Sequence, residues 1–311
     1  MLAAMSIFAG CEKTGIYSTS TSPKTPPPTE PKSRFYAYRD NLLIGGYVYT
    51  MEGFEGKRPA IIFCTGLDAS YAATEPYAIA AADLGYISCC FDFCGGLDNN
   101  MTSLSGGKKP DNSVLTELLD LDAVYKVISA REDVDPDNVI VMGGSQGGLV
   151  AALYAARHPS DVRALGLLFP AFNLPDLVRN GVRDKIGDVN LNLIPDVFFP
   201  QEFEGHKFYK KYLVDAMTLY PFEEIDAFKG PVLIIHGDTD TIVPYSVSEQ
   251  AAEIYDTAQY YLIPGQGHGF DAAGTAKAIE YLEDFLSDLI PGKPGAGKEV
   301  HGHPGRASRL I

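Results

Sequence analysis

The sequence has few basic residues for its number of acidic ones. Its 311 residues include 25 Lys and Arg against 40 Asp and Glu, which gives a formal net charge of −15. No basic patch interleaved with aromatic residues offsets this charge, and an acidic surface repels the phosphates of nucleic acids. We therefore expect no nucleic-acid partner.

The sequence also lacks the cysteine and histidine spacing of a metal site. Cys89, Cys90 and Cys94 lie in and just after an apolar run, and no second cysteine pair has zinc-ligand spacing. The odd total of 5 cysteines argues against a complete disulfide framework. The one tight histidine pair, His301 and His303, lies in a polar tail. We expect buried free thiols, no metal and no cofactor.

The N-terminus lacks the positive charge with which signal peptides usually open, and its apolar run is too short to span a bilayer. Residues 1–10 are nevertheless apolar and end in small residues directly before Cys11, which resembles the lipobox of bacterial lipoproteins. We expect residues 1–11 to be a lipoprotein signal, with a lipid anchor at Cys11 and an extracytoplasmic protein. The alternative is a fortuitous apolar N-terminus and a cytoplasmic protein.

Two segments have compositions that cannot build a core. Residues 12–34 are rich in Pro, Ser and Thr, which is typical of an extended tether. Residues 291–311 are rich in Gly, Pro, Lys and His, so we expect a disordered tail. The remaining segment, residues 35–290, is expected to form one domain.

Strand-like and helix-like segments alternate along this domain. Several strands are apolar throughout and therefore buried on both faces, as in a parallel sheet covered by helices; the expected strands are 42–51, 60–64, 86–93, 138–142, 164–169, 232–235 and 260–263. Helical periodicity fills the gaps, at 77–84, 114–130, 148–157, 246–255 and 276–289. The order predicts an α/β fold, with a mostly parallel central sheet flanked by helices. Residues 171–226 are too long for one crossover helix, so we expect a cap insertion over the carboxyl edge of the sheet.

The segment Gly143–Gly147 matches the nucleophile elbow Gly-x-Ser-x-Gly, with Ser145 as the nucleophile. The motif alone is weak, but an apolar strand leads into it and a helical segment leads out, as the elbow requires. A glycine-rich turn in this place could instead hold a phosphate. The Gly-x-x-x-x-Gly-Lys-Ser/Thr pattern of phosphate loops is absent from the chain.

A serine hydroxyl needs a histidine to take its proton and a carboxylate to orient that histidine. The segment 231–244 is a buried strand that runs into a loop with Asp238 and Asp240, and the hydrolase pattern His-Gly-x-x-Asp-x-x-Val-Pro places the acid at Asp240. Asp238 is then a loop-stabilising residue and His236 a structural one. His268, in the glycine-rich loop after the last strand, completes the order Ser, Asp, His.

An oxyanion hole needs two donors aimed at the developing charge. One is the backbone N–H of Gln146, directly after the nucleophile. The second is expected from the loop after the strand 60–64, at the N–H of Leu67. Many related hydrolases have His-Gly where this chain has Thr65 and Gly66; this departure leaves the backbone donor intact, but the sequence does not identify the side chain that braces the loop.

From about Pro59 to Leu289 the chain resembles the cinnamoyl and feruloyl esterases among the α/β hydrolases. The resemblance rests on the acid and histidine loops and on the segments 91–96, 144–148 and 167–171. It departs from that group at residues 97–100. The resemblance implies that Asp176 and Tyr209 hold the phenolic hydroxyl of the substrate, between aromatic walls from Phe198, Phe199 and Phe208. Alternatively, Asp176 caps a helix and Tyr209 packs within the cap.

Together these features predict a serine hydrolase that cleaves carboxylic esters through an acyl-enzyme. The favoured partners are small-molecule hydroxycinnamoyl esters, such as those derived from plant cell walls, or other small aryl or acyl esters. A peptidase with the same triad and a non-catalytic binding module on the same scaffold remain as alternatives.

Overall fold

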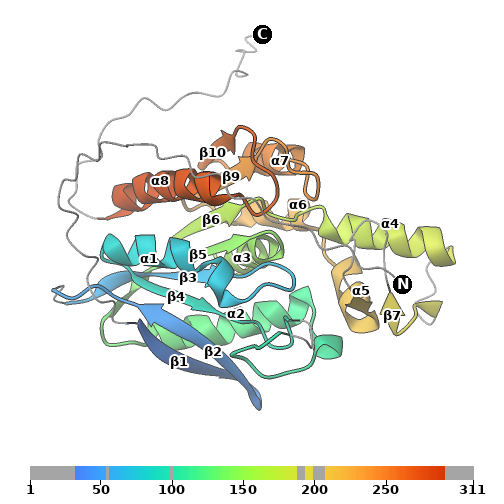
Figure 1. Cartoon of the computed structure of the whole chain (residues 1–311), viewed down its shortest axis with the longest axis horizontal. Helices are drawn as coiled ribbons and strands as arrows, with labels where there is room; N and C mark the ends of the chain where they lie inside the picture. The colour runs from blue at the N-terminus through green and yellow to red at the C-terminus, as the bar shows by residue number, and fades with distance from the viewer. Residues whose placement is uncertain (1–31, 54–55, 98–100, 188–192, 199–206, 291–311) are drawn as a thin grey trace, which may run out of the picture. The chain divides into compact units, whose positions relative to one another are not determined.

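A computed structural model describes residues 32–53, 56–97, 101–187, 193–198 and 207–290 (Figure 1). These residues belong to one compact unit of the chain, residues 31–311. The expected lipoprotein signal with Cys11, linker residues 12–31 and the expected tail 291–311 lie outside the described residues.

An eight-stranded sheet forms the centre of this unit, with the strand order β1-β2-β4-β3-β5-β6-β9-β10. The strands are β1 (Lys32–Arg39), β2 (Leu42–Tyr49), β3 (Arg58–Cys64), β4 (Ile87–Phe91), β5 (Val134–Gly144), β6 (Ala164–Leu168), β9 (Val232–Gly237) and β10 (Ala258–Ile263). Strand β2 pairs antiparallel with both β1 and β4, and all pairs from β4 to β10 are parallel. The predicted α/β fold with a mostly parallel sheet is confirmed.

Helices cover both faces of the sheet because its central strands are apolar on both sides. On β3, Ala60 and Ile62 belong to one buried cluster and Ile61 and Phe63 to the other. The first cluster packs under α2 (Val114–Ser129), α3 (Gln146–Arg157) and α7 (Ser246–Ile254). The second packs under α1 (Glu75–Asp83) and α8 (Ala272–Leu289), on the opposite face of the sheet, because successive residues of β3 point to opposite faces.

The four cysteines in the described part of the chain are all free and buried; they are Cys64, Cys89, Cys90 and Cys94. Burial raises the pKa of each of these thiols. They therefore belong to the core, as the sequence predicts.

Strand β1 was not predicted from the sequence. It begins at Lys32, so residues 32–34 lie in a strand and not in the linker to which the sequence analysis assigned them. Only Phe35 and Ala37 of this strand are buried. An edge strand that buries one face carries too few apolar residues to stand out beside the fully buried strands.

The insertion at 171–226, which we continue to call the cap, forms helices and a pair of two-residue strands. They are α4 (Leu174–Ile186), the two-stranded pair β7 (Val197–Phe198) and β8 (Phe208–Tyr209), α5 (Lys210–Met217), α6 (Pro221–Glu224) and the 3₁₀ helix η4 (Ile225–Ala227). Helix α4 packs on α5, and α5 packs on α2 and on the 3₁₀ helix η2 (Lys109–Asp111). The cap thus contacts the sheet domain near the start of α2.

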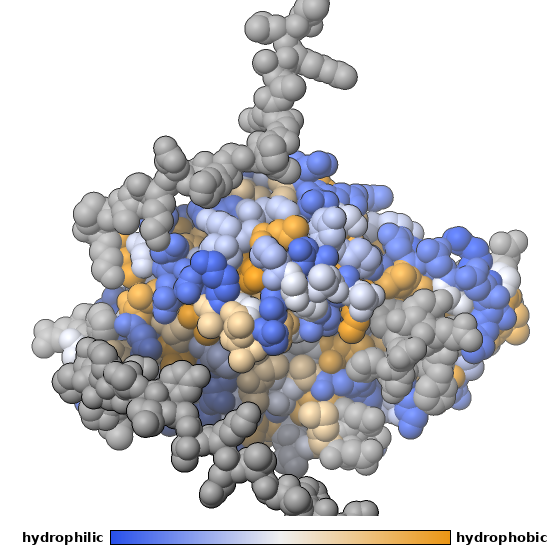
Figure 2. Space-filling model, turned by 45° about the horizontal axis from the view of Figure 1, so that its top comes forward, coloured by the Kyte–Doolittle hydropathy of each residue, from blue (hydrophilic) through white to orange (hydrophobic). Residues whose placement is uncertain are grey.

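Large apolar side chains are exposed in the acid loop, at Ile242 and Tyr245, and in the cap, at Leu193 and Val197. On the face shown in Figure 2, apolar residues form separate patches among polar ones.

No helix in the described ranges combines the length and the apolar character needed to cross a membrane.

Candidate active site

Ser145 lies at a sharp turn between β5 and α3. Its backbone has φ +53° and ψ −122°, a left-handed conformation that few residues other than glycine adopt. The turn is tight, since a Cβ atom on Gly143 would lie 2.2 Å from the carbonyl oxygen of Gly147. A Cβ atom on Gly147 would lie 2.4 Å from the carbonyl oxygen of Cys64. Both positions therefore require glycine, as the nucleophile elbow predicts.

The structure brings Ser145, His268 and Asp240 together, although they come from three distant parts of the chain. His268 Nε2 lies 2.9 Å from Ser145 Oγ, and His268 Nδ1 lies 2.7 Å from Asp240 Oδ2. An ionised carboxylate only accepts hydrogen bonds, so Nδ1 carries the proton and Nε2 accepts the serine hydroxyl. This tautomer leaves His268 ready to take the proton of Ser145.

Asp240 is held in place from several directions. Its Oδ1 accepts the backbone N–H groups of Ile242 and Val243, each at 2.9 Å. Burial acts to raise its pKa, but hydrogen bonds from His236, His268 and the Val243 N–H outweigh that effect and lower the pKa well below its ordinary value. Asp240 therefore stays ionised and keeps its acceptor role toward His268.

Asp238 has a different place in the same loop. Its Oδ1 accepts the backbone N–H of Gly265 at 2.6 Å, which ties the acid loop to the histidine loop. This contact fits the loop-stabilising role that the sequence suggested, and it leaves Asp240 as the acid beside His268.

His236 has a role at the site that the sequence reasoning missed. It is fully buried, and its Nε2 lies 2.9 Å from the carbonyl oxygen of Val243 and 3.1 Å from Asp240 Oδ2. Both neighbours are acceptors, so Nε2 carries the proton, and Nδ1 accepts the Ser248 hydroxyl at 2.7 Å. The imidazole thus donates to the triad acid in addition to supporting the loop.

A phenylalanine packs against the catalytic histidine. The ring of Phe169 meets the His268 imidazole edge to face, with a centroid distance of 4.8 Å, and meets Phe270 in the same manner at 4.9 Å. Phe169 has φ +37°, which is rare for a bulky residue. Its position directly after β6 places an apolar wall against His268.

The two predicted oxyanion donors come from elements that meet at Ser145. Gln146 is the first residue of α3, where a backbone N–H has no acceptor within the helix. A Cβ atom on Gly66 would lie 3.3 Å from Ser145 Cβ, so the loop that carries Leu67 lies against the nucleophile. Lys109 braces this loop, because its ammonium group pairs with Asp68 and donates to the Gly96 carbonyl at 2.7 Å.

The two predicted substrate ligands lie in the cap. Asp176 is in the first turn of α4, with 62% of its side chain exposed, and pairs with Arg179 Nη2 at 2.6 Å. Tyr209 is partly buried and lines a hollow of about 360 Å³ together with Pro110, Val197 and neighbouring charged residues. Within the described ranges, neither side chain hydrogen-bonds to Ser145, Asp240 or His268. Of the expected aromatic walls, Phe199 lies outside the described residues.

Comparisons with known proteins agree with this fold. A family model described as alpha/beta hydrolase fold matches residues 59–187. An uncharacterized protein of Mycobacterium tuberculosis is 28% identical over 232 residues, which cover 74% of this chain and 69% of that protein. Esterase LipQ of the same organism is 28% identical over 177 residues, covering 53% of this chain and 41% of LipQ.

Among solved structures, Est1E from Butyrivibrio proteoclasticus with ferulic acid bound superposes with a TM-score of 0.71 and 25% identity. The match covers 82% of this chain and 99% of Est1E. Fold, triad geometry and relatives point to hydrolysis of the esterase type. The chain is an α/β-hydrolase-fold protein that resembles the esterases of this fold, feruloyl esterases among them.

Proposed function

We propose that this protein is a serine esterase whose preferred substrates are hydroxycinnamoyl esters or similar small aryl esters. The observation that carries the proposal is the hydrogen-bonded chain from Ser145 Oγ through His268 to the ionised Asp240. The esterases among the similar proteins support the reaction type.

The reaction follows from this chain of contacts. Ser145 Oγ attacks the ester carbonyl carbon while His268 Nε2 takes the hydroxyl proton, and the N–H groups of Leu67 and Gln146 bind the oxyanion. The C–O bond to the alcohol then breaks, and His268 returns its proton to the leaving oxygen. Water, deprotonated by His268, cleaves the acyl-enzyme in the same way and releases the acid.

We propose the hollow beside Tyr209 as the place where the aryl group binds. Pro110, which lines it, directly follows Lys109, and Lys109 pairs with Asp68 next to the oxyanion residue Leu67. The hollow therefore borders the segment that braces the oxyanion loop. As the resemblance implies, we assign the phenolic hydroxyl to Tyr209 and Asp176, although Asp176 pairs with Arg179 in the structure.

A hydrolysis panel tests the proposal. It compares short aliphatic, long aliphatic and hydroxycinnamoyl esters with aminoacyl-p-nitroanilides, and a fluorophosphonate probe reports whether Ser145 is reactive. We expect labelling of the wild type but not of Ser145→Ala, and the highest kcat/KM on methyl ferulate or methyl p-coumarate. Preference for the anilides would indicate a peptidase, and absence of labelling would indicate a binding module.

We also propose that Cys11 carries a lipid anchor, on the sequence pattern that precedes it. Full-length protein expressed in its native host should then partition with membranes, and Cys11→Ala should release it. One acyl chain binds only marginally, so firm anchoring needs the several chains of a bacterial lipoprotein. Equal partitioning of both forms would contradict the anchor.

A further inference from the structure

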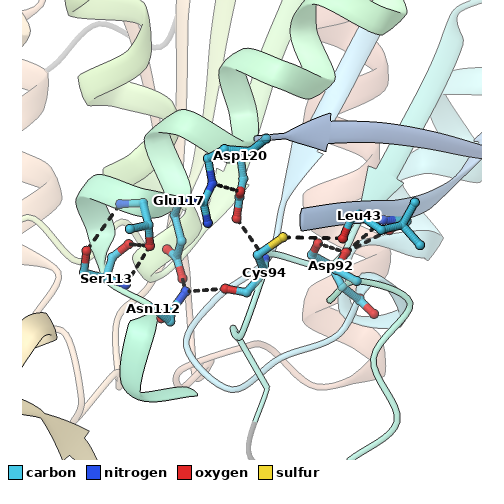
Figure 3. A network of polar contacts seen from close by, with 11 residues as sticks. Leu43, Asp92, Cys94, Asn112, Ser113, Glu117 and Asp120 are labelled. Carbon is cyan, nitrogen blue, oxygen red and sulfur yellow. Dashed lines mark hydrogen bonds and ion pairs between the residues drawn. The ribbon is translucent and has the colours of Figure 1, made fainter. Parts of the chain in front are cut away.

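A buried carboxylate lies beside the nucleophile elbow. Glu117, in the first turn of α2, is only 2% exposed. Its Oε1 accepts the side-chain amide of Asn112 at 3.1 Å, and Asn112 also donates to the Cys94 carbonyl at 3.2 Å (Figure 3). Its Oε2 accepts the side-chain amide of Gln146 at 2.7 Å. Glu117 is therefore in direct contact with the residue that supplies an oxyanion donor.

Glu117 is bonded to amides and not to a cation. The nearby Lys109 directs its ammonium group to Asp68 and to the Gly96 carbonyl instead. Burial raises the pKa of Glu117, hydrogen bonds from Gln146 and Asn112 lower it in part, and the resulting pKa is about 7. A buried acid without a paired cation is costly, so its position calls for a role other than stability.

The Gln146 side chain is held at both ends. Its amide nitrogen donates to Glu117, and its amide oxygen accepts the hydroxyl of Tyr212. Both partners are buried, as is Gln146 itself. A side chain fixed at both polar atoms restricts the backbone that carries it, and here that backbone includes the N–H directed at the oxyanion site.

Tyr212 belongs to the cap. It lies on α5, and the same helix is docked on the start of α2 by Asp215, whose carboxylate accepts the Ser113 hydroxyl at 2.6 Å. Ser113 is the N-cap of α2, one turn before Glu117. Helix α5 thus contacts both the nucleophile elbow, through Tyr212, and the N-terminus of α2, through Asp215.

We infer that Glu117 and Tyr212 are positioning residues that hold Gln146, and that through them the cap helix α5 is linked to the oxyanion hole. The inference rests on the proposed hydrolysis at Ser145. It assigns to the cap an influence on the rate of the chemical step, in addition to any contact with the substrate.

Steady-state kinetics of Tyr212→Phe and Glu117→Gln on p-nitrophenyl acetate test the inference. Misplacing one oxyanion donor should lower kcat roughly 10- to 100-fold, while KM stays within about twofold because the ground state does not use the oxyanion contact. The Ki of a boronic acid, which forms a tetrahedral adduct with the serine, should rise in parallel with the loss in kcat/KM.

Two matched variants serve as controls. Tyr86→Phe removes another buried tyrosine hydroxyl, which donates to the Leu286 carbonyl at 2.8 Å on the opposite face of the sheet. Asp120→Asn neutralises a buried acid one turn further along α2, which binds Arg39 and the Cys94 N–H and not Gln146 (Figure 3). Both controls should keep the wild-type kcat.

A double-mutant cycle separates the inference from a general loss of packing. If Tyr212 and Glu117 act through the Gln146 side chain, neither substitution should lower kcat further once Gln146→Ala is present. Additive losses in that background, or a wild-type kcat for Tyr212→Phe, would overturn the inference. Failure of the wild type to react with the fluorophosphonate probe would instead contradict hydrolysis at Ser145.

Discussion

The triad side chains and the two cap side chains that we propose as substrate ligands are held in different ways. At the carboxyl edge of the sheet, Asp240 accepts hydrogen bonds from two backbone N–H groups and two imidazoles, and it is almost fully buried. In the cap, Asp176 is mostly exposed and has a surface partner three residues away, while Tyr209 lines an open hollow. Asp240 therefore has several hydrogen-bond donors that fix its position, whereas Asp176 and Tyr209 have few such contacts.

This difference leads us to expect that the triad determines the rate on all esters, whereas Asp176 and Tyr209 determine which esters are preferred. Redundant anchors hold reacting groups within the narrow tolerance that catalysis requires. Side chains with few contacts, such as Asp176 and Tyr209, can change without disturbing the triad. We therefore expect substitutions at the sheet edge to affect all substrates, and substitutions at Asp176 and Tyr209 in the cap to affect particular ones.

The largest effect should come from the triad. Ser145→Ala or His268→Ala should lower kcat by roughly 10⁴-fold or more on every ester, because the three residues act as a unit. Asp240→Asn should also reduce kcat strongly, whereas Asp238→Asn, which affects only the contact between the loops, should cost much less. A larger loss for Asp238→Asn than for Asp240→Asn would show that the acid is misassigned.

Glu117 should make protein stability depend on pH. Its pKa is raised from 4.5 to about 7, so the folded state holds a proton that the unfolded state has lost in this range. The free energy of unfolding should therefore fall as the pH rises from about 4.5 to 7, by about 3 kcal/mol relative to Glu117→Gln. Denaturant titrations between pH 4.5 and 8 measure this difference.

The exposed glutamate of α7, Glu253, supplies the control for this measurement. Glu253→Gln should reproduce the wild-type dependence on pH. If Glu117→Gln also followed the wild-type curve, Glu117 would not titrate as its burial implies.

A substitution at His236 tests whether its imidazole helps to hold Asp240 in place. His236→Gln removes the imidazole that donates to Asp240, and a hydrogen bond to a charged group contributes about 1.5 to 3 kcal/mol to stability. We expect a loss of that size in urea unfolding, together with a smaller loss of kcat than Asp240→Asn causes. Ser248→Ala, which removes only the outer hydroxyl, should have a weaker effect in the same direction. A wild-type kcat for His236→Gln would show that the backbone N–H groups of Ile242 and Val243 are sufficient to hold Asp240 for catalysis.

The smallest expected effect is confined to one class of substrate. Asp176→Ala and Tyr209→Phe should each lower kcat/KM for methyl ferulate by about 1 to 3 kcal/mol, the cost of an unpaired buried hydroxyl, and barely change hydrolysis of p-nitrophenyl acetate. The ratio of the two rates is the measurement. Equal losses on both substrates would show that these residues have a structural role and would remove the distinction between triad and cap.

The sequence predicted those parts of the fold that buried apolar strands define. Every strand that is apolar on both faces was located, and the elbow, acid and histidine motifs follow β5, β9 and β10 directly. Strand β1 escaped detection because it buries only Phe35 and Ala37. The elements of the cap were not resolved individually, since its strands are only two residues long.

The residues that hold Gln146 in place could not be predicted, because their contacts join parts of the chain that are far apart in sequence. Glu117 and Gln146 are 29 positions apart, and Tyr212 and Gln146 are 66 apart. One signal was present, since Glu117 falls on the same helical face as the buried Leu121 and Val124. A charged residue on an otherwise apolar face indicates that a buried partner exists, but it does not identify that partner.

The backbone of Ser145 has a consequence for natural selection on this protein. At φ +53° and ψ −122°, a residue with a side chain costs on the order of 1–3 kcal/mol, whereas glycine adopts the same angles freely. Selection for thermal stability alone would therefore favour Ser145→Gly, which removes the nucleophile. Serine persists at such a position over many generations only in lineages where loss of the hydroxyl lowers fitness.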